Sequence, residues 1–400
     1  MITRVRVRKM LKKGIALLIA FLLLLCGVRM TEAAALEERP AAARSIPDTL
    51  GVETKAKAAL VMDAASGRVL FAKNANTRLP MASTTKILSA LLALEQDGID
   101  EWFTVDTAAI HVEGSSMGLR EGDQATLRAL AYGMLLPSGN DAAGAAAVRI
   151  AGSKERFAEM MNERAAEIGM EDSHFVTPSG LDDPEHYSSA YDMALLAREA
   201  LENPLFAEIC AKPSAKIQYG NPPYDRWLQN HNRLLKSYPG TVGVKTGFTD
   251  SAGRCLVSCA DREGVRLIVV TLSCPDDWNE HKKLYDRYFG LLRPEEVGGL
   301  VPEVEIPVTG GERDAVAAVF DEPGPVALMD GERVDVAVTA APFLYAPVRR
   351  GQVVGSVKFS CDGQPLAEAA LTAARDVDAE ETKPSLWSRL FGWLGRGGDD

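Results

Sequence analysis

The chain has 400 residues, of which 46% are hydrophobic and 25% are charged, a composition typical of globular proteins. This length predicts two domains, or one large domain, with a sizeable hydrophobic core. The formal net charge is -11 and no basic stripe follows the N-terminus, which argues against nucleic acid as a partner.

Residues 1–35 have the three parts of a secretory signal peptide. A basic stretch over residues 4–13 precedes an apolar run over 15–28, and the alanines at 33–35 offer a small-residue cleavage site. The apolar run is short for a membrane span, so we favour cleavage over an uncleaved anchor. The sequence therefore predicts an exported protein.

No metal or cofactor is expected. Five cysteines follow residue 35, an odd and scattered set that predicts buried free thiols rather than a disulfide framework. Cys255 and Cys259 have no histidine neighbours to complete a zinc site, and the spacing of His174 and His186 fits no zinc signature.

The predicted elements begin with a hairpin, continue with helices and end in strands. Alternation and turn residues predict strands at 58–63, 68–72, 254–260 and 265–273, while helical periodicity predicts helices at 127–136, 154–168 and 191–201. Beyond residue 294, alternating segments at 304–308, 334–338 and 353–359 indicate a small β-rich region.

The first candidate site is Ser83 and Lys86, three residues apart at the start of an apolar segment. Pro80 and Ser83 are helix start signals, and residues i and i+3 share a helix face. A serine needs a base to become a nucleophile, and a buried lysine with a lowered pKa can act as one. Taken alone, this spacing is common by chance.

The second candidate site is Ser138 and Asn140, which flank a glycine in a tight turn between two helical runs. Both side chains can point into one cleft, although serine, glycine and asparagine are also ordinary turn residues.

The third candidate site is Lys245-Thr246-Gly247-Phe248, on or beside a strand edge. Lys245 and the Thr246 hydroxyl can bind a carboxylate, and Gly247 allows a ligand to approach the backbone. The positive charge of Lys245 would also favour a neutral Lys86. The alternative is a solvated lysine in an ordinary turn.

The three motifs together resemble the active-site serine penicillin-recognising enzymes. Within them, the chain is most similar to the low-molecular-mass penicillin-binding proteins that are serine D-alanyl-D-alanine carboxypeptidases. The resemblance implies an α/β (α+β) fold: a β-lactamase/transpeptidase-like domain, with an antiparallel sheet flanked by helices, followed by a small β-rich domain.

The resemblance also implies the residue roles. Ser83 would attack the bond between two D-alanines of a peptidoglycan stem peptide with Lys86 as base, and Ser138 would relay a proton. Asn140 would bind the substrate amide, Lys245 and Thr246 the terminal carboxylate. The backbone N–H groups of Ser83 and Phe248, beside Gly247, would form the oxyanion hole. β-Lactam antibiotics would acylate the same serine. Some relatives have histidine where this chain has Phe248.

Two alternatives remain. A class A-like β-lactamase would need a Glu-x-x-x-Asn loop, and Glu199 to Asn203 fits that spacing but reads as the end of a helix. A non-catalytic binding protein for the cell wall or β-lactams would keep the fold without turnover.

The predicted domains are 1–35 (signal peptide), 36–294 (catalytic), 295–378 (small and β-rich) and 379–400 (a linker and an amphipathic helix). Residues 386–396 would place tryptophan, phenylalanine and leucine on one helical face, which suits a membrane surface. We therefore expect the protein on the outer face of the cytoplasmic membrane, on the periplasmic or extracellular side.

Overall fold

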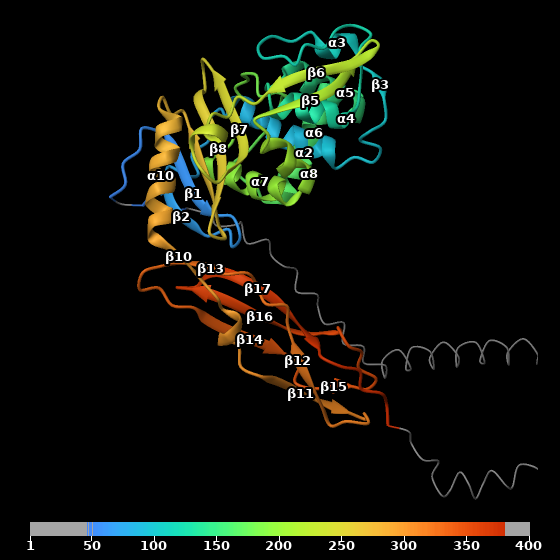
Figure 1. The fold of residues 1–400 in the computed structure, drawn as a ribbon, viewed down its shortest axis with the longest axis vertical. Coiled ribbons are helices and arrows are strands. Elements are labelled where there is room, and N and C mark those ends of the chain that lie inside the picture. The colour runs from blue at the N-terminus through green and yellow to red at the C-terminus, as the bar shows by residue number, and fades with distance from the viewer. Residues whose placement is uncertain (1–45, 47, 50, 381–400) are drawn as a thin grey trace, which may run out of the picture. The chain divides into compact units, whose positions relative to one another are not determined.

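The computed structural model describes residues 46, 48–49 and 51–380 (Figure 1). The predicted signal peptide at 1–35 and the predicted helix at 386–396 lie outside the described residues. The helices and 3-10 turns are η1 (Ala82–Thr85), α2 (Lys86–Leu94), α3 (Thr107–Ile110), α4 (Leu127–Leu135), α5 (Asn140–Ala151), α6 (Lys154–Ile168), α7 (Ala190–Glu202), α8 (Pro204–Cys210), α9 (Leu234–Ser237), α10 (Asp277–Leu291) and η2 (Gly298–Leu300).

The central element is a five-stranded antiparallel sheet in the order β2-β1-β9-β8-β7. Its strands are β1 (Ala58–Asp63), β2 (Val69–Lys73), β7 (Thr241–Thr249), β8 (Gly253–Arg262) and β9 (Val265–Leu272). Both predicted hairpins are present, β1 with β2 and β8 with β9. β7 is an edge strand, so its outer side is free of strand pairing within the sheet.

Helices cover both faces of this sheet, because its central strands are apolar on both sides. On β8, Leu256 and Ala260 pack in the core beneath α10, while Val257 and Cys259 pack with the helical lobe. This two-residue alternation is the strand period. Figure 1 shows α10 along one face of the sheet and the helical lobe on the other.

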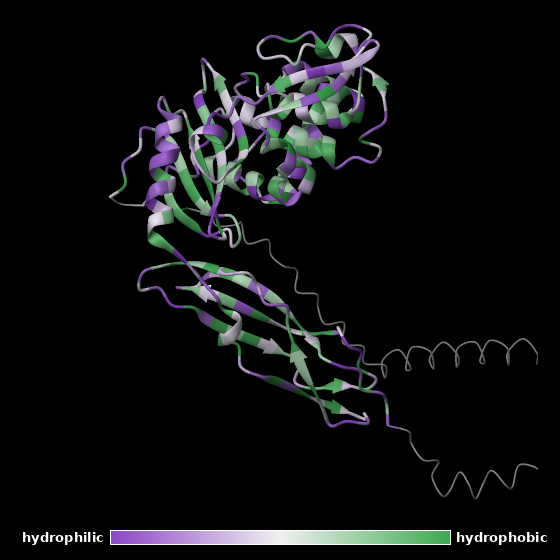
Figure 2. Ribbon diagram, in the orientation of Figure 1, coloured by the Kyte–Doolittle hydropathy of each residue, from purple (hydrophilic) through white to green (hydrophobic). Residues whose placement is uncertain are grey.

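The helical lobe is built around α2. Every residue of α2 is buried, as the all-round apolar sequence predicts. In Figure 2 the helices of this lobe carry hydrophobic bands, whereas α10 is hydrophilic over much of its length. Beside the lobe lies a four-stranded sheet in the order β3-β4-β5-β6, whose strands are β3 (Phe103–Thr104), β4 (Gln124–Ala125), β5 (Ser214–Gly220) and β6 (Pro223–Gln229).

The chain after α10 is β-rich, as predicted. β10 (Leu292–Glu295) pairs with β13 (Val326–Met329), and a six-stranded sheet has the order β14-β16-β17-β12-β11-β15. Its strands are β11 (Val304–Thr309), β12 (Ala315–Val319), β14 (Asp335–Ala340), β15 (Leu344–Tyr345), β16 (Val353–Cys361) and β17 (Gln364–Ala373). This region has its own apolar core, which includes Val316, Val357 and Phe359.

The predicted fold class is confirmed, and two local expectations were wrong or incomplete. Ser83 does not begin an α-helix: it lies in the 3-10 turn η1, and α2 begins at Lys86. The hairpin of β5 with β6 and the helices α8 and α10 were not expected. No helix within the described residues is both long enough and apolar enough to span a membrane.

The five cysteines of the described region are free and buried, as predicted. Burial raises the pKa of Cys255 to about 12, which keeps this thiol protonated and unreactive at neutral pH.

Candidate active site

Ser83 lies in a strained turn that faces edge strand β7. Ala82 before it has a φ of +49°, and the hydroxyls of Thr84 and Thr85 donate to the carbonyl oxygens of Met81 and Ala82. These local hydrogen bonds compete with α-helical ones and explain why the helix starts only at Lys86. The turn therefore presents Ser83 ahead of the helix rather than within it.

A glycine seals the other side of this turn. A Cβ on Gly180, whose φ is +83°, would lie 2.0 Å from the carbonyl oxygen of Ala82 and 2.7 Å from Thr85 Oγ1. Only glycine fits such a close backbone approach at positive φ.

Lys86 meets the requirements for a base. Its Nζ lies 2.8 Å from Ser83 Oγ and donates to the carbonyl oxygen of Ser179 at 2.8 Å. The side chain is completely buried, and this desolvation, together with the charge of Lys245, holds the pKa of Lys86 well below its ordinary value. A neutral amine at this position can accept the proton of Ser83.

Lys245 lies beneath the same site. It is 1% exposed, and its Nζ donates to the carbonyl oxygen of Thr246 at 2.8 Å. Lys245 pairs with Val257 across β7 and β8, so it points to the face of the sheet that the helical lobe covers. Burial lowers the pKa of Lys245 to about 7.

Ser138 lies in the predicted turn between α4 and α5, and Asn140 is the first residue of α5. Ser138 has a φ of +62° and is 4% exposed. Asn140 is 5% exposed, and its Nδ2 donates to the carbonyl oxygen of Glu113 at 2.6 Å. A Cβ on Gly139 would lie 2.9 Å from the backbone nitrogen of Met117, so glycine is required between them.

β7 passes close to the nucleophile. A Cβ on Gly247 would lie 3.1 Å from the backbone nitrogen of Ser83 and 2.9 Å from the carbonyl oxygen of Met81. Phe248, the next residue, has 61% of its surface exposed. Gly247 thus allows the backbones at Ser83 and Phe248 to lie near each other.

Two clefts meet at Ser83, and both are also lined by Phe248. The first, of about 450 Å³, is lined in addition by Ser138, Thr246 and Gly247. The second, of about 630 Å³, is lined by Asn140, Ser115 and the segment 179–182. The structure therefore gathers six of the predicted site residues around these clefts, with Lys86 and Lys245 buried below them.

The sequence comparisons agree with this geometry. Residues 42–276 match the family of D-alanyl-D-alanine carboxypeptidases, peptidase family S11. The chain belongs to this family. Residues 298–379 match the C-terminal domain of penicillin-binding protein 5.

Relatives cover most of the chain. It is 34% identical to the D-alanyl-D-alanine carboxypeptidase DacF of Bacillus subtilis, over 81% of this chain and 86% of that protein. It is 33% identical to DacC of Escherichia coli, over 85% and 90% respectively. The crystal structure of penicillin-binding protein 5 from Haemophilus influenzae is similar with a TM-score of 0.66 and 29% identity, over 84% of this chain and all of that one.

These findings confirm the predicted family, a low-molecular-mass penicillin-binding protein of the serine D-alanyl-D-alanine carboxypeptidase type. They also disfavour the β-lactamase alternative. Glu199 lies in α7 and pairs with Arg164 at 2.6 Å, and α7 ends directly before Asn203, which caps α8. Neither residue lines the clefts at Ser83.

Sequence reasoning missed two positioning residues of this carboxypeptidase-family site. Asp141 is buried, and its carboxylate accepts from the Ser116 hydroxyl and from the backbone N–H groups of Met117, Gly118 and Leu119, which fixes the loop beside the cleft. The sequence feature that could have identified Asp141 is its position directly after the candidate site residue Asn140.

His186 is the second missed residue. Its Nδ1 accepts from the backbone N–H of Val176 at 2.9 Å, so Nε2 carries the proton and donates to Thr85 Oγ1 at 2.8 Å. Burial lowers the pKa of His186 to about 4. Within the described residues no group of three or more histidine, cysteine or acidic side chains is arranged to hold a metal ion.

Proposed function

We propose that this carboxypeptidase removes the terminal D-alanine from peptidoglycan stem peptides, with Ser83 as nucleophile and Lys86 as base. The 2.8 Å separation of Lys86 Nζ and Ser83 Oγ carries the proposal, together with the lowered pKa of the buried amine. Ser83 Oγ bonds to the carbonyl carbon as its proton passes to Lys86.

The next step breaks the peptide bond. The C–N bond of the terminal D-alanine breaks, and its nitrogen receives a proton that originates on Lys86 and is relayed through the Ser138 hydroxyl. Water then hydrolyses the acyl-enzyme ester and returns Ser83 to its free form. The positions of Ser138 and Ser83 along one cleft support this route.

Binding groups surround the reacting carbonyl. In this proposal Thr246 and Lys245 bind the terminal carboxylate and Asn140 binds the peptide amide. The backbone N–H groups of Ser83 and Phe248 hold the oxyanion, at about 3 kcal/mol per donor. The close approach of β7 to Ser83 at Gly247 supports this pairing of donors.

We further propose that the enzyme acts outside the cytoplasm, on the outer face of the membrane. The basic and apolar pattern of residues 1–35 supports export. The tryptophan, phenylalanine and leucine pattern of residues 386–396, with arginines on the opposite face, supports attachment to the membrane surface.

The test combines mass spectrometry of the protein after addition of penicillin with D-alanine release from a Lys-D-Ala-D-Ala peptide. We expect a long-lived adduct on Ser83 and steady release of D-alanine. Ser83→Ala should abolish the adduct and lower kcat by about four orders of magnitude or more. Ser237→Ala, at an exposed serine of α9, is the matched control. Rapid penicillin hydrolysis without D-alanine release would instead indicate a β-lactamase, and neither activity would indicate a binding protein.

A further inference from the structure

The two clefts at Ser83 have opposite charge. The first is lined by Arg233, Arg254 and Asp277. Arg254 pairs with Asp277 at 3.0 Å, which leaves the positive charge of Arg233 uncompensated by any of the other residues that line this cleft. The second is lined by three acidic residues, Glu113, Asp182 and Asp250, and by no lysine, arginine or histidine among the described residues.

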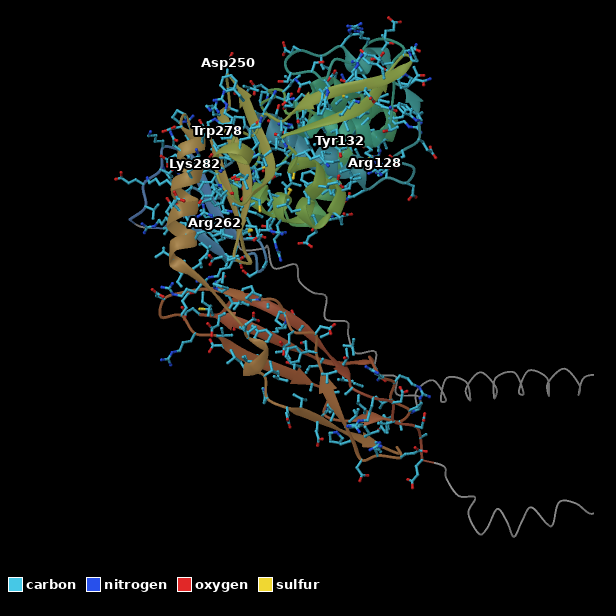
Figure 3. The ribbon with its side chains drawn as sticks, viewed as in Figure 1. Arg128, Tyr132, Asp250, Arg262, Trp278 and Lys282 are labelled. Atoms are coloured by element: carbon cyan, nitrogen blue, oxygen red, sulfur yellow. The ribbon has the colours of Figure 1, made fainter. Side chains whose placement is uncertain are left out.

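The three acidic side chains are available to a ligand. No ion pair within the described residues involves any of them. Asp182 accepts from the hydroxyl of Thr249 at 2.7 Å, which ties the loop to the end of β7. Asp250 lies just beyond that strand end (Figure 3).

A buried amide independently marks the second cleft as a ligand site. Asn140 lines it and is 95% buried, since its exposed fraction is 5%, yet its Oδ1 has no hydrogen-bond partner among the described residues. Its Nδ2 is already engaged by the carbonyl oxygen of Glu113, so Oδ1 is left to accept from an incoming N–H. A buried acceptor without a partner is unfavourable, and a peptide substrate would satisfy it.

The charge difference orients the substrate, and this step rests on the proposed function. A D-Ala-D-Ala peptide has its carboxylate on the leaving residue, which the cationic first cleft suits. The acyl portion then extends from Ser83 into the second cleft, beside edge strand β7. The residue before the two D-alanines is the diamino acid, so its side chain lies nearest Asp182, Asp250 and Glu113.

We propose that the second cleft selects stem peptides whose diamino acid presents a free side-chain ammonium with no adjacent carboxylate. The three carboxylates of the cleft attract a side chain that carries only an ammonium. They repel a carboxylate next to that ammonium, so this repulsion cancels the attraction. The acidic side chains are exposed, so the preference is about tenfold and weakens with salt.

The test measures kcat/KM for D-alanine release by the full chain from three peptides ending in D-Ala-D-Ala. Their third residues are L-lysine with a free ammonium, Nε-acetyl-L-lysine, and diaminopimelate, whose ammonium adjoins a carboxylate. At low salt we expect the first peptide to exceed the other two by about tenfold. The ratio should approach one in the Asp182→Asn, Asp250→Asn double variant.

Asp97→Asn is the matched control, because Asp97 is exposed and lines neither cleft, and it should keep the tenfold ratio. Equal kcat/KM for the three peptides, or a ratio that the double variant leaves unchanged, would overturn this selectivity while the proposed function stands. Release from none of them, without a penicillin adduct on Ser83, would overturn the proposed function itself.

Discussion

The two faces of the five-stranded sheet each bury a cluster of polar side chains, and the clusters differ in how their hydrogen bonds are completed. Beneath α10, His281 bonds Ser258 Oγ at 2.7 Å through Nδ1 and Thr271 Oγ1 at 2.9 Å through Nε2. Tyr285 Oη lies 2.7 Å from Ser258 Oγ. Both ring nitrogens of His281 therefore have hydrogen-bond partners within this cluster of His281, Ser258, Thr271 and Tyr285, which we call the His281 cluster.

The active-site cluster, on the side of the helical lobe, has hydrogen-bonding groups that are not satisfied within the described residues. Asn140 Oδ1 has no hydrogen-bond partner, and Lys86 and Lys245 are buried without an ion pair to any acidic side chain within the described part of the chain. Buried polar side chains in a structural role have their hydrogen bonds satisfied within the protein. Unsatisfied hydrogen-bonding groups and buried lysines with lowered pKa values are instead typical of sites that bind or react with a ligand. The comparison therefore separates a structural cluster from a catalytic one.

The largest expected effect is on activity, from Lys86→Met. Methionine fills a similar volume but cannot take the proton of Ser83, so kcat should fall by about a thousandfold or more. Stability should stay within about 1 kcal/mol, because the lost bond to Ser179 is offset by relief of a desolvated amine. D-alanine release and urea unfolding measure the two quantities. A large loss of stability with little loss of kcat would contradict this prediction, because it would give Lys86 a structural role and not a catalytic one.

The opposite pattern is expected for His281→Ala. The change leaves Thr271 without its partner and opens a cavity, so the free energy of unfolding should fall by about 3 kcal/mol. Because His281 lies on the face away from Ser83, kcat/KM of the folded enzyme should change by less than about twofold. A folded variant with tenfold lower kcat/KM would show that this cluster influences the active site.

The pH dependence of stability sharpens the same comparison. Burial lowers the pKa of His281 to about 3, from an ordinary value of 6.5. Below pH 6.5 the unfolded chain takes up a proton that the folded chain does not, so stability falls as the pH falls. By pH 5 this amounts to about 2 kcal/mol.

Urea unfolding at pH 7 and pH 5 tests this linkage. His281→Ala should lose about 2 kcal/mol less than the unaltered protein between the two values, since it lacks the titrating group. His186, whose pKa is lowered to about 4 by burial, should persist as a second source of acid sensitivity. Parallel curves for the two proteins would show that His281 is not the group that titrates.

The sequence predicted the sheet hairpins, the apolar α2 and the three motifs, because two-residue and helical periodicities and short motifs are local signals. It did not predict the 3-10 turn at Ser83. The Thr84 and Thr85 hydroxyls close this turn locally, but Gly180, which packs against it, and His186, which bonds Thr85, come from about 100 residues away in the sequence. The acidic second cleft was also missed. Glu113, Asp182 and Asp250 come from three separate loops, and only the folded chain shows that they share a cleft.

The smallest expected effect is that of Phe248→Ala. The ring is 61% exposed between the two clefts, and the proposed oxyanion contact uses the backbone N–H, which alanine retains. We therefore expect kcat/KM for a D-Ala-D-Ala peptide to change by less than about threefold, in line with surface substitutions. Phe343→Ala, at an exposed phenylalanine of the β-rich region, controls for loss of an exposed ring. A drop of thirtyfold confined to Phe248→Ala would mean that the ring itself contacts the peptide, and the exposed surface between the clefts would then count as part of the binding site.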